Sequence, residues 1–317
     1  MAGLDFISIG EVLIDMIPGM TKEGASCFLP KVGGAPVNVA CVLARLGCRA
    51  GFVGRVGRDA FGRQITAVLQ QQGVDTSLLQ QDEERETTLA FVHLNEEGER
   101  SFSFYRNGLA DTRLEAAEEA RRAVRTARMV HFGSVALAEE PERSAVLTLI
   151  AEARQAGRVV SYDPNLRFPL WSSEAALKKT VLETLQYADL IKLSDEEAQF
   201  LFGISDPAEA ARHVQREYGT AMVFVTCGRN GAWGCTGKET AFAPALQIDC
   251  VDTTGAGDCF LGAACFCLLN RQQEWEKLSH EELEEILRFA CAAGSMATTK
   301  RGAIDAIPML EEIQAAL

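Results

Sequence analysis

The sequence predicts an α/β protein in which a mostly parallel central sheet carries helices on both faces and a small extra β-sheet lies beside it. Short β-branched or apolar runs alternate with longer helical stretches over most of the 317 residues, which is typical of a parallel sheet covered by helices. One section breaks the alternation with two consecutive strand-like runs, which indicates a hairpin outside the main layers. No internal repeat, low-complexity tract or Pro/Ser-rich linker divides the chain, so we treat residues 1–317 as a single domain.

Strand and helix pairs account for the first part of the predicted sheet. The strands are the short apolar runs FISIGEVLI, AGFVGRV, MVHFGSV, VVSYD and LIKLS, in chain order. The helices predicted to follow them are Pro36–Leu46, Phe61–Gln72, Glu142–Ala156, Ser173–Tyr187 and Asp195–Phe202.

The last third of the chain continues this pattern. The run MVFVTCG predicts a further strand, and GAWGCTGKETAFAPALQ after it resembles a hairpin. Two long helices are predicted to flank RQQEWEKLSHEELEE. The core sheet should therefore contain about eight or nine strands.

The section that breaks the alternation predicts a lid. Thr87–Leu94 and Ser101–Arg106 are strand-like runs joined by the turn-forming residues Asn95, Glu96, Glu97 and Gly98. The irregular, Gly-containing stretch Pro18–Val32 could complete a small sheet with this hairpin. We expect the lid to comprise about residues 12–35 and 87–110 and to lie over a crevice at the sheet edge.

Composition and charge exclude several classes of function. The 44 acidic and 31 basic residues give a formal charge of −13, which offers no basic surface for nucleic acid or an anionic membrane. The longest uncharged apolar run, Cys259–Leu269, is too short to span a bilayer, and the acidic N-terminal segment predicts a first strand and not a signal peptide. The ten scattered Cys residues lack a CxxC pair, which indicates reduced thiols in the cytoplasm. The four isolated His residues predict no transition-metal site.

The most informative motif is Asp252-Thr253-Thr254-Gly255-Ala256-Gly257-Asp258, which directly precedes an apolar helix. Successive small residues let backbone N–H groups converge on an anion, and the positive end of the helix dipole adds to the same point. Asp258 in the first helical turn could accept a proton from an attacking hydroxyl group. The alternative is structural, with Asp258 as a favourable N-terminal acid and the glycines as a turn.

A second motif, Gly33-Gly34-Ala35-Pro36-Val37-Asn38, lets the backbone approach a ligand closely at the start of a helix. Asn38 could bind sugar hydroxyls, or it could satisfy local backbone groups in a simple loop. Asp15 ends the run GEVLID, so we expect its carboxylate at the carboxyl end of a strand, where open α/β sheets bind ligands.

Three further segments carry weaker signals. Thr226-Cys227-Gly228-Arg229-Asn230-Gly231 could hold a phosphate or ribose, or it could be a simple glycine turn. The spacing of Ser194 and Glu197 favours a structural capping box. Asp163-Pro164-Asn165-Leu166-Arg167 places Asn and Arg just past a strand, where an ordinary turn is an equal alternative.

Common nucleotide signatures are absent from the sequence. The Walker spacing fails around Gly237-Lys238, no GxGxxG follows the first strand, and the VAIK, HRD and DFG motifs of protein kinases are missing. A bound nucleotide would therefore need another phosphate cradle.

The order and spacing of GGAPVNVA near the start and VDTTGAGD near the end resemble the paired signatures of the ribokinase-like (PfkB) carbohydrate kinases. The resemblance extends over essentially the whole chain. The segments GEVLIDMIP, FVGRVG, FYRNGLAD, HFGSVAL, SYDPNLR and LIKLSDEEAQFL look most like those of fructokinases. This resemblance implies a ribokinase-like three-layer sandwich with a β lid. It also implies transfer of the γ-phosphoryl group of ATP to the 6-hydroxyl of D-fructose.

The resemblance also implies roles for individual residues. Asp258 would be the general base, and Gly255, Ala256 and Gly257 would form the anion hole. The residues implied to bind the sugar are Asp15, Gly33, Gly34, Asn38, Arg106 and Arg167. Those implied to bind ATP are Ser194, Thr226, Gly228, Gly231, Gly257 and Cys291. Glu197 would hold Mg²⁺ through water, and a K⁺ site would use Asp252, Thr254, Ala297, Lys300 and Gly302.

Two positions depart from the family pattern. Ser194 stands where the NxxE motif has Asn, and Cys291 stands where some ribokinases present Asn near the adenine. Base recognition would then be mainly apolar and made through the backbone.

Several alternatives remain open at this point. A 2-keto-3-deoxygluconate kinase shares the lid and the DPNLR arginine, and another sugar kinase of the family, acting on ribose or a nucleoside, ranks below it. A non-catalytic sugar-binding sensor on the same fold and a dinucleotide oxidoreductase belong to other classes. The partners expected are a small sugar and ATP, with no nucleic acid or membrane, and the edges of the lid would favour a homodimer formed through paired lids.

Overall fold

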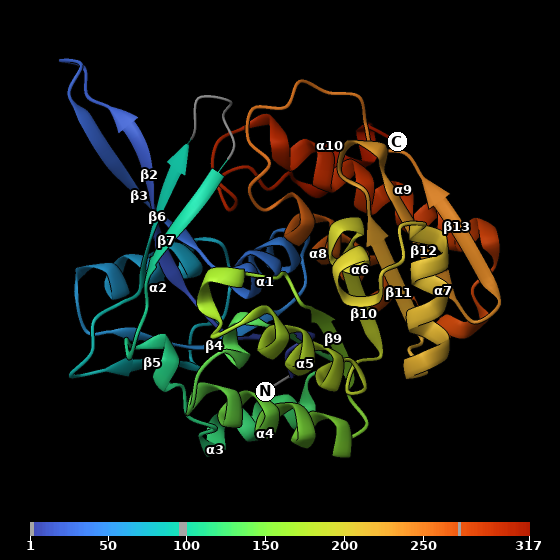
Figure 1. Ribbon diagram of the computed structural model, residues 1–317, viewed down its shortest axis with the longest axis horizontal. Coiled ribbons are helices and arrows are strands. Elements are labelled where there is room, and N and C mark those ends of the chain that lie inside the picture. The colour runs from blue at the N-terminus through green and yellow to red at the C-terminus, as the bar shows by residue number, and fades with distance from the viewer. Residues whose placement is uncertain (1–2, 95–99, 272–273) are drawn as a thin grey trace.

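The computed structural model describes residues 3–94, 100–271 and 274–317, which form a nine-stranded sheet between two layers of helices (Figure 1). The strand order is β13-β12-β11-β10-β9-β8-β1-β4-β5. The strands from β11 to β5 run parallel, and β12 and β13 add an antiparallel hairpin at one edge. The predicted class and number of core strands are thus confirmed. The bounds are β1 (Phe6–Ile9), β4 (Ala50–Gly57), β5 (Leu79–Asp82), β8 (Met129–Gly133), β9 (Val159–Asp163), β10 (Leu190–Ser194), β11 (Met222–Thr226), β12 (Ala232–Thr236) and β13 (Glu239–Ala243).

Two hydrophobic cores separate the sheet from its helices. One core contains buried side chains from α1 (Ala35–Arg45), α2 (Ala60–Gln71), α8 (Ala256–Leu269), α9 (His280–Met296) and α10 (Leu310–Ala315). The other contains buried side chains from α3 (Glu118–Thr126), α4 (Glu142–Gln155), α5 (Glu174–Leu185), α6 (Asp195–Phe202) and α7 (Pro207–Tyr218). The helices predicted in the first part of the chain lie within about two residues of their expected ends, whereas α3, α7 and α10 were not predicted.

The alternation of side chains along each buried strand explains why both cores form. In β11, Met222 and Phe224 enter the core beneath α8, while Val223 and Val225 enter the opposite core. Successive side chains of a strand point to opposite faces, so a continuous apolar run is buried on both sides. This is the pattern expected of a central parallel strand.

The small sheet has the strand order β3-β2-β6-β7 and projects from one end of the molecule (Figure 1). Its strands are β2 (Leu13–Met20), β3 (Ser26–Gly33), β6 (Leu89–Leu94) and β7 (Arg100–Tyr105). The strands predicted at Thr87–Leu94 and Ser101–Arg106 are thus confirmed as β6 and β7, whereas their role as part of a lid stays a prediction. The predicted turn at residues 95–98 lies outside the described residues.

The stretch 18–32, expected to be irregular, forms an antiparallel ladder between β2 and β3. Pro18 is tolerated in β2 because it lies beyond Ile14–Met16, the segment through which β2 pairs with β6. The expected contribution of this stretch to the small sheet is therefore confirmed, and its backbone is more regular than expected.

The run FISIGEVLI, predicted to be one strand, is divided between the two sheets. β1 ends at Ile9, and β2 begins at Leu13 in the small sheet. Gly10 has a φ of 145°, a region open mainly to glycine, and this turns the chain out of the central sheet. Asp15 consequently lies within a lid strand and not at the end of a core strand, which corrects its expected position.

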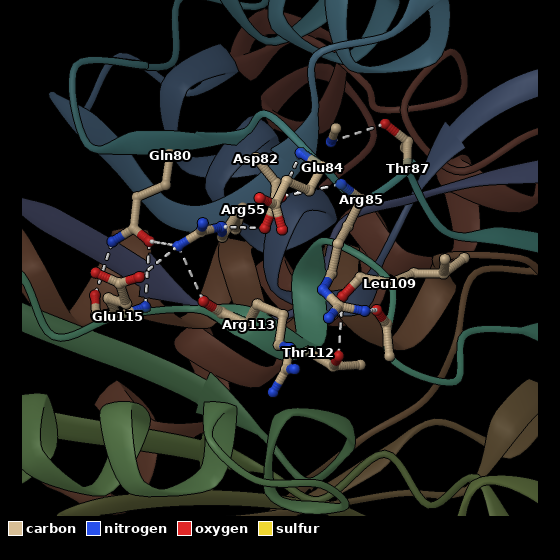
Figure 2. Close-up of polar contacts among 12 residues, drawn as sticks. Arg55, Gln80, Asp82, Glu84, Arg85, Thr87, Leu109, Thr112, Arg113 and Glu115 are labelled. Carbon is tan, nitrogen blue, oxygen red and sulfur yellow. Dashed lines mark hydrogen bonds and ion pairs between the residues drawn. The ribbon is translucent and has the colours of Figure 1, made fainter.

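A polar network fixes the segments just before β6 and just after β7 to the edge of the central sheet (Figure 2). Arg55 of β4 forms ion pairs with Asp82 and Glu115 at 2.9 Å each, and it also donates to the Arg113 carbonyl. Arg85, just before β6, donates to the carbonyl of Gly108, just after β7, at 2.7 Å. Both ends of the β6–β7 hairpin are therefore held to each other and to the edge of the sheet.

Within the described residues, no helix is both long and apolar enough to cross a membrane. All ten Cys residues are free thiols, and six of them are buried.

Candidate functional site

Two adjoining cavities lie at the carboxyl ends of the parallel strands. The first, of about 510 Å³, lies between the lid strands β2 and β7, the segment after β9 and the start of α8. The second, of about 400 Å³, lies between the ends of β10 and β11, the start of α8 and the side of α9. Lys192, Thr253 and Gly257 line both cavities, so these three residues mark where the cavities meet. Ligands of open α/β sheets bind at this end of the strands.

Asp258 lies in the first turn of α8 and lines the first cavity. Its side chain is 7% exposed, and its Oδ2 accepts a hydrogen bond from Asn38 Nδ2 at 2.7 Å. Asn165 Nδ2 donates to the other carboxylate oxygen at 3.3 Å. Burial raises the pKa of Asp258 above its ordinary value, although the Asn38 hydrogen bond and the positive charge of Lys192 act in the opposite direction. The structure thus presents an oriented, more basic carboxylate to the cavity.

The start of α8 forms a close backbone turn. Gly255 is the N-cap with a φ of 78°, and a Cβ there would lie 2.5 Å from the Cβ of Ala303. The Ala256 N–H donates to the Thr253 carbonyl at 3.2 Å, while the first N–H groups of any helix lack partners within the helix. Positive φ and close packing both require glycine at position 255. The turn can offer N–H groups and the helix dipole to an anion.

The second glycine motif makes room for its neighbours. A Cβ on Gly33 would lie 2.1 Å from Asp15 Oδ2, and a Cβ on Gly34 would lie 2.6 Å from the Glu11 carbonyl oxygen. Asp15, Gly34 and Asn38 line the first cavity, and Gly33 supports the Asp15 carboxylate beside it. The structure therefore brings together the residues that the sequence singled out here.

The two predicted arginines differ in their positions. Arg167 lines the first cavity and donates to Asn165 Oδ1 at 2.6 Å, and Asn165 in turn contacts Asp258. Arg106 is 2% exposed, does not line the cavity, and pairs with Asp111 at 2.7 Å and with Glu142. These two carboxylates hold Arg106 outside the lining of the first cavity in this structure, and its contact with the sugar stays a prediction.

Glu11 was not predicted, yet it lines the first cavity and is 4% exposed. Its Oε1 accepts from the Ala35 N–H at 3.3 Å, and its Oε2 is buried without a hydrogen-bond partner. Burial raises the pKa of Glu11 to about 7 against the opposing charge of Arg106. A carboxylate inside the buried run GEVLI was the available signal.

Lys192 was also missed by the sequence reasoning. It lies in β10, is 6% exposed, and pairs with Asp163 Oδ2 of β9 at 3.1 Å. Burial acts to lower the pKa of Lys192, but the Asp163 carboxylate outweighs it and raises the pKa above its ordinary value. The signal was a charged residue in the middle of the apolar run LIKLS.

The residues expected to bind a nucleotide surround the second cavity. Ser194, Thr226, Gly228, Gly231 and Cys291 all line it together with Gly257. The ends of β10 and β11, the segment between β11 and β12, the start of α8 and the side of α9 therefore contribute to one site. Its walls combine backbone, hydroxyl and apolar groups.

Glu197 does not line the second cavity. It lines a smaller one of about 260 Å³ beside it. Its carboxylate accepts from the Ser194 N–H at 2.8 Å and from the Leu166 N–H at 2.7 Å. The capping box favoured from the spacing of Ser194 and Glu197 is confirmed. Glu197 also ties the segment after β9 to the start of α6.

Two of the positions expected for a K⁺ site, Thr254 and Gly302, contact the carboxylate of a third, Asp252. Its Oδ1 accepts from the Thr254 N–H at 2.8 Å, and its Oδ2 accepts from the Gly302 N–H at 3.0 Å. Thr254 Oγ1 is buried without a hydrogen-bond partner. Ala297 and Lys300 belong to the same 297–302 segment as Gly302.

The likeness to known proteins extends over the whole chain. The model of the pfkB family carbohydrate kinases matches residues 4–310. The probable fructokinase-4 of Arabidopsis thaliana is 40% identical over 314 residues, which cover 98% of this chain and 96% of the plant protein.

Solved structures show the same relation. A crystal structure of fructokinase from Vibrio cholerae O395 with fructose, ADP and calcium ion bound has a TM-score of 0.88 at 33% identity, covering 100% of both chains. Fructokinase from Xylella fastidiosa with bound ATP has a TM-score of 0.87 at 31% identity, covering 98% of this chain and 97% of the other. These structures share the ribokinase-like sandwich and its separate small sheet. By sequence and by fold, the chain belongs to the pfkB family of carbohydrate kinases.

Proposed function

We propose that this enzyme transfers the γ-phosphoryl group of ATP to the 6-hydroxyl group of D-fructose. The observation that carries the proposal is the position of Asp258, whose carboxylate faces the first cavity beside the junction with the second. The relatives support both substrates, since the Vibrio cholerae structure contains fructose and ADP, and the Xylella fastidiosa structure contains ATP. Fructose then occupies the first cavity and ATP the second.

In this mechanism, Asp258 accepts the proton of the attacking hydroxyl group. Asn38 and Asn165 hold its two carboxylate oxygens, so the group is oriented before the sugar arrives. The raised pKa of Asp258 makes it a stronger base than an exposed aspartate. The N–H groups at Gly255, Ala256 and Gly257 and the α8 dipole stabilise the transferring phosphoryl group.

Asp15, Gly34, Asn38 and Arg167 bind the sugar in this proposal, and Gly33 keeps space for Asp15. Ser194, Thr226, Gly228, Gly231 and Cys291 bind the nucleotide. The lid strands β2 and β7 contribute to the first cavity, so they exclude water that would otherwise accept the phosphoryl group. ATP hydrolysis without sugar should therefore be slow.

Mg²⁺ enters with ATP in this proposal. The described residues contain no group of three or more His, Cys, Asp or Glu side chains that could hold a metal ion. Mg²⁺ commonly uses substrate phosphates, waters and one or two carboxylates, which fits Glu196 at the edge of the second cavity and Glu197 behind it. When bound, Mg²⁺ neutralises charge on the β- and γ-phosphates.

A K⁺ ion beside the start of α8 is the second ion we propose. The unpartnered Thr254 Oγ1 and the Asp252 carboxylate supply oxygen atoms there, together with carbonyl groups of Ala297, Lys300 and Gly302. Replacing K⁺ in the assay with choline should lower turnover. Equal turnover in the two salts would contradict the site.

A coupled ADP-release assay tests the proposal directly. Fructose, 2-keto-3-deoxygluconate, ribose and glucose are compared at equal concentrations with Mg²⁺ and ATP. The highest kcat/KM should belong to fructose, and removal of Mg²⁺ should abolish ADP release. A preference for 2-keto-3-deoxygluconate would reassign the substrate. Sugar binding without ADP release from any sugar would favour the sensor.

We further propose a homodimer formed through the lids. The small sheet projects from the rest of the molecule (Figure 1). Three of its residues, Met20, Leu29 and Tyr105, are 67%, 49% and 62% exposed. Pairing of two lids would cover these side chains. Light scattering after size-exclusion chromatography should give twice the mass of one chain. Leu29→Asp should reduce the measured mass to that of a single chain.

The cytoplasm is the proposed location of the enzyme. Its ten free thiols suit a reducing compartment, and ATP is supplied there. We expect the enzyme to keep its activity when a thiol reductant is added. A strict requirement for oxidised cysteines would contradict this location.

A further inference from the structure

The junction between the two cavities contains a buried cation. Lys192, Thr253 and Gly257 line both cavities, and of these three residues Lys192 carries a charge. A phosphoryl group that moves from a nucleotide in the second cavity to an acceptor in the first must cross this junction. It therefore passes beside the Lys192 ammonium group.

The surroundings of Lys192 leave space for this approach. A Cβ built on Gly257 would lie 3.2 Å from Lys192 Nζ, so the ammonium group lies beside the first turn of α8. Any larger residue at position 257 would crowd it. The same glycine thus brings a lysine and a helix N-terminus together at one point.

Burying the charged side chain of Lys192 within β10 costs free energy, so its presence there requires an explanation. Leu190, two residues earlier on the same face, enters the core beneath α8, whereas Lys192 takes the place of the next apolar side chain. Asp163 pairs with it at 3.1 Å, and this carboxylate keeps the lysine charged. A buried pair of this kind is weak evidence for stability, because apolar residues of similar volume often serve as well.

We propose that Lys192 is a catalytic residue whose Nζ donates a hydrogen bond to the transferring γ-phosphoryl group. This extends the proposed kinase function and assigns to β10 the cation that a Walker loop would supply. In the step, the acceptor hydroxyl oxygen bonds to the γ-phosphorus, and its proton goes to Asp258. The bond from that phosphorus to the β,γ-bridging oxygen breaks, and ADP leaves with the electron pair. Lys192 stays protonated throughout and stabilises the non-bridging oxygens.

A structural role for Lys192 makes a different prediction. If the lysine only neutralises Asp163, removing both charges should restore function, because no buried charge is left uncompensated. The test therefore compares Lys192→Met, Asp163→Asn and the double variant Lys192→Met/Asp163→Asn. Asp163→Asn is the matched control, since it keeps the lysine and changes only its partner.

Nucleotide affinity gives a readout that does not need the sugar. Calorimetry with Mg²⁺ measures the dissociation constants of ATP and ADP for each variant. A lost charge-assisted hydrogen bond to the γ-phosphate should weaken ATP about tenfold in the double variant relative to Asp163→Asn, and ADP much less. Equal weakening of ATP and ADP, or no change in either, would overturn the proposal.

Turnover provides the second readout. On the best sugar of the panel, kcat of the double variant should be about 10²- to 10³-fold below that of Asp163→Asn, with the sugar dissociation constant within about threefold. A double variant as active as the control would assign Lys192 to neutralising Asp163 and overturn the proposal. If the wild-type enzyme phosphorylates no sugar, the fructose proposal fails, while the comparison of ATP and ADP still decides the role of Lys192. Should Lys192→Met/Asp163→Asn not fold, Lys192→Gln/Asp163→Asn replaces it in both measurements.

Discussion

Replacing Asp258 with Asn separates the catalytic role of this residue from its structural one. In the folded protein, Asn38 donates to Oδ2 at 2.7 Å, and the Oδ1 of an asparagine could still accept this bond. The amide group of the new side chain would then face Asn165 Nδ2, which now donates at 3.3 Å. Two donors would meet there, and the lost hydrogen bond costs about 0.5–1.5 kcal/mol.

The removal of a buried negative charge acts in the opposite direction. Burial raises the pKa of Asp258, so the folded state pays an ionisation cost at any pH above that pKa. The substitution removes this cost, and the net change in unfolding free energy should stay within about 1 kcal/mol. By contrast, loss of a general base lowers turnover by about two or more orders of magnitude, equivalent to about 3 kcal/mol or more in the transition state.

The assay combines kcat from coupled ADP release, sugar affinity from calorimetry and stability from urea unfolding. Asp258→Asn should lower kcat at least about 100-fold with nearly unchanged sugar affinity. The wild-type kcat should rise with pH as Asp258 loses its proton, and Asp258→Asn should remove this rise. Asp206→Asn is the matched control, since Asp206 is an exposed N-cap of α7 and Asn caps a helix equally well.

Near-normal turnover of Asp258→Asn would refute its role as the base. A loss of activity that accompanies a loss of several kcal/mol in stability would refute the separation of roles. Either result would require a different proton acceptor or a different account of the α8 start.

Three other substitutions test the structural assignments. Arg106→Met should destabilise the fold by about 3–5 kcal/mol in urea unfolding, because it leaves two buried carboxylates uncompensated, and weaker sugar binding without this loss would return Arg106 to the sugar site. The pKa of Glu11 rises from 4.5 in the unfolded chain to about 7 in the folded protein, so the wild type should lose stability as the pH rises from 4.5 to about 7. Glu11→Gln should therefore be up to about 3 kcal/mol more stable than the wild type at pH 8 but not at pH 4. Parallel pH profiles of the two proteins' stability would contradict this. Gly255→Ala should lose both turnover and stability, whereas Gly24→Ala, with a similar φ of 81° but no atom within 4 Å of the added Cβ, should lose only about 1–2 kcal/mol; equal losses would remove the packing argument.

Much of the fold follows from local patterns in the sequence. The helix Asp195–Phe202 matches its expected bounds because a capping box fixes its start and a left-handed Gly203 fixes its end. The α8 start is equally local, since the glycines and Asp258 lie within four consecutive residues. The chemistry of such a site can be inferred before any tertiary contact is known.

The rest depends on tertiary position. The run FISIGEVLI looks like one continuous strand, and nothing local marks Gly10 as the point where it divides. Its division between two sheets depends on which strands are available to pair on each side. Arg106 has the same local signature whether it contacts a ligand or an ion-pair partner. Glu142 pairs with it from 36 residues away, and local spacing contains no record of that contact.

Lys192 shows how a functional residue can be concealed by a regular pattern. The run LIKLS predicts its strand correctly, and a lysine in such a run is easily assigned to an edge or to solvent. In the folded chain, β10 pairs with β9 and β11 on its two sides, so no edge is open to it. A charge there must be compensated from a neighbouring strand, and Asp163 ends β9 at that level. A charged residue in a strand predicted to be central is therefore a stronger indication of a site than its frequency suggests, because only a paired and well-placed ion can remain at that position.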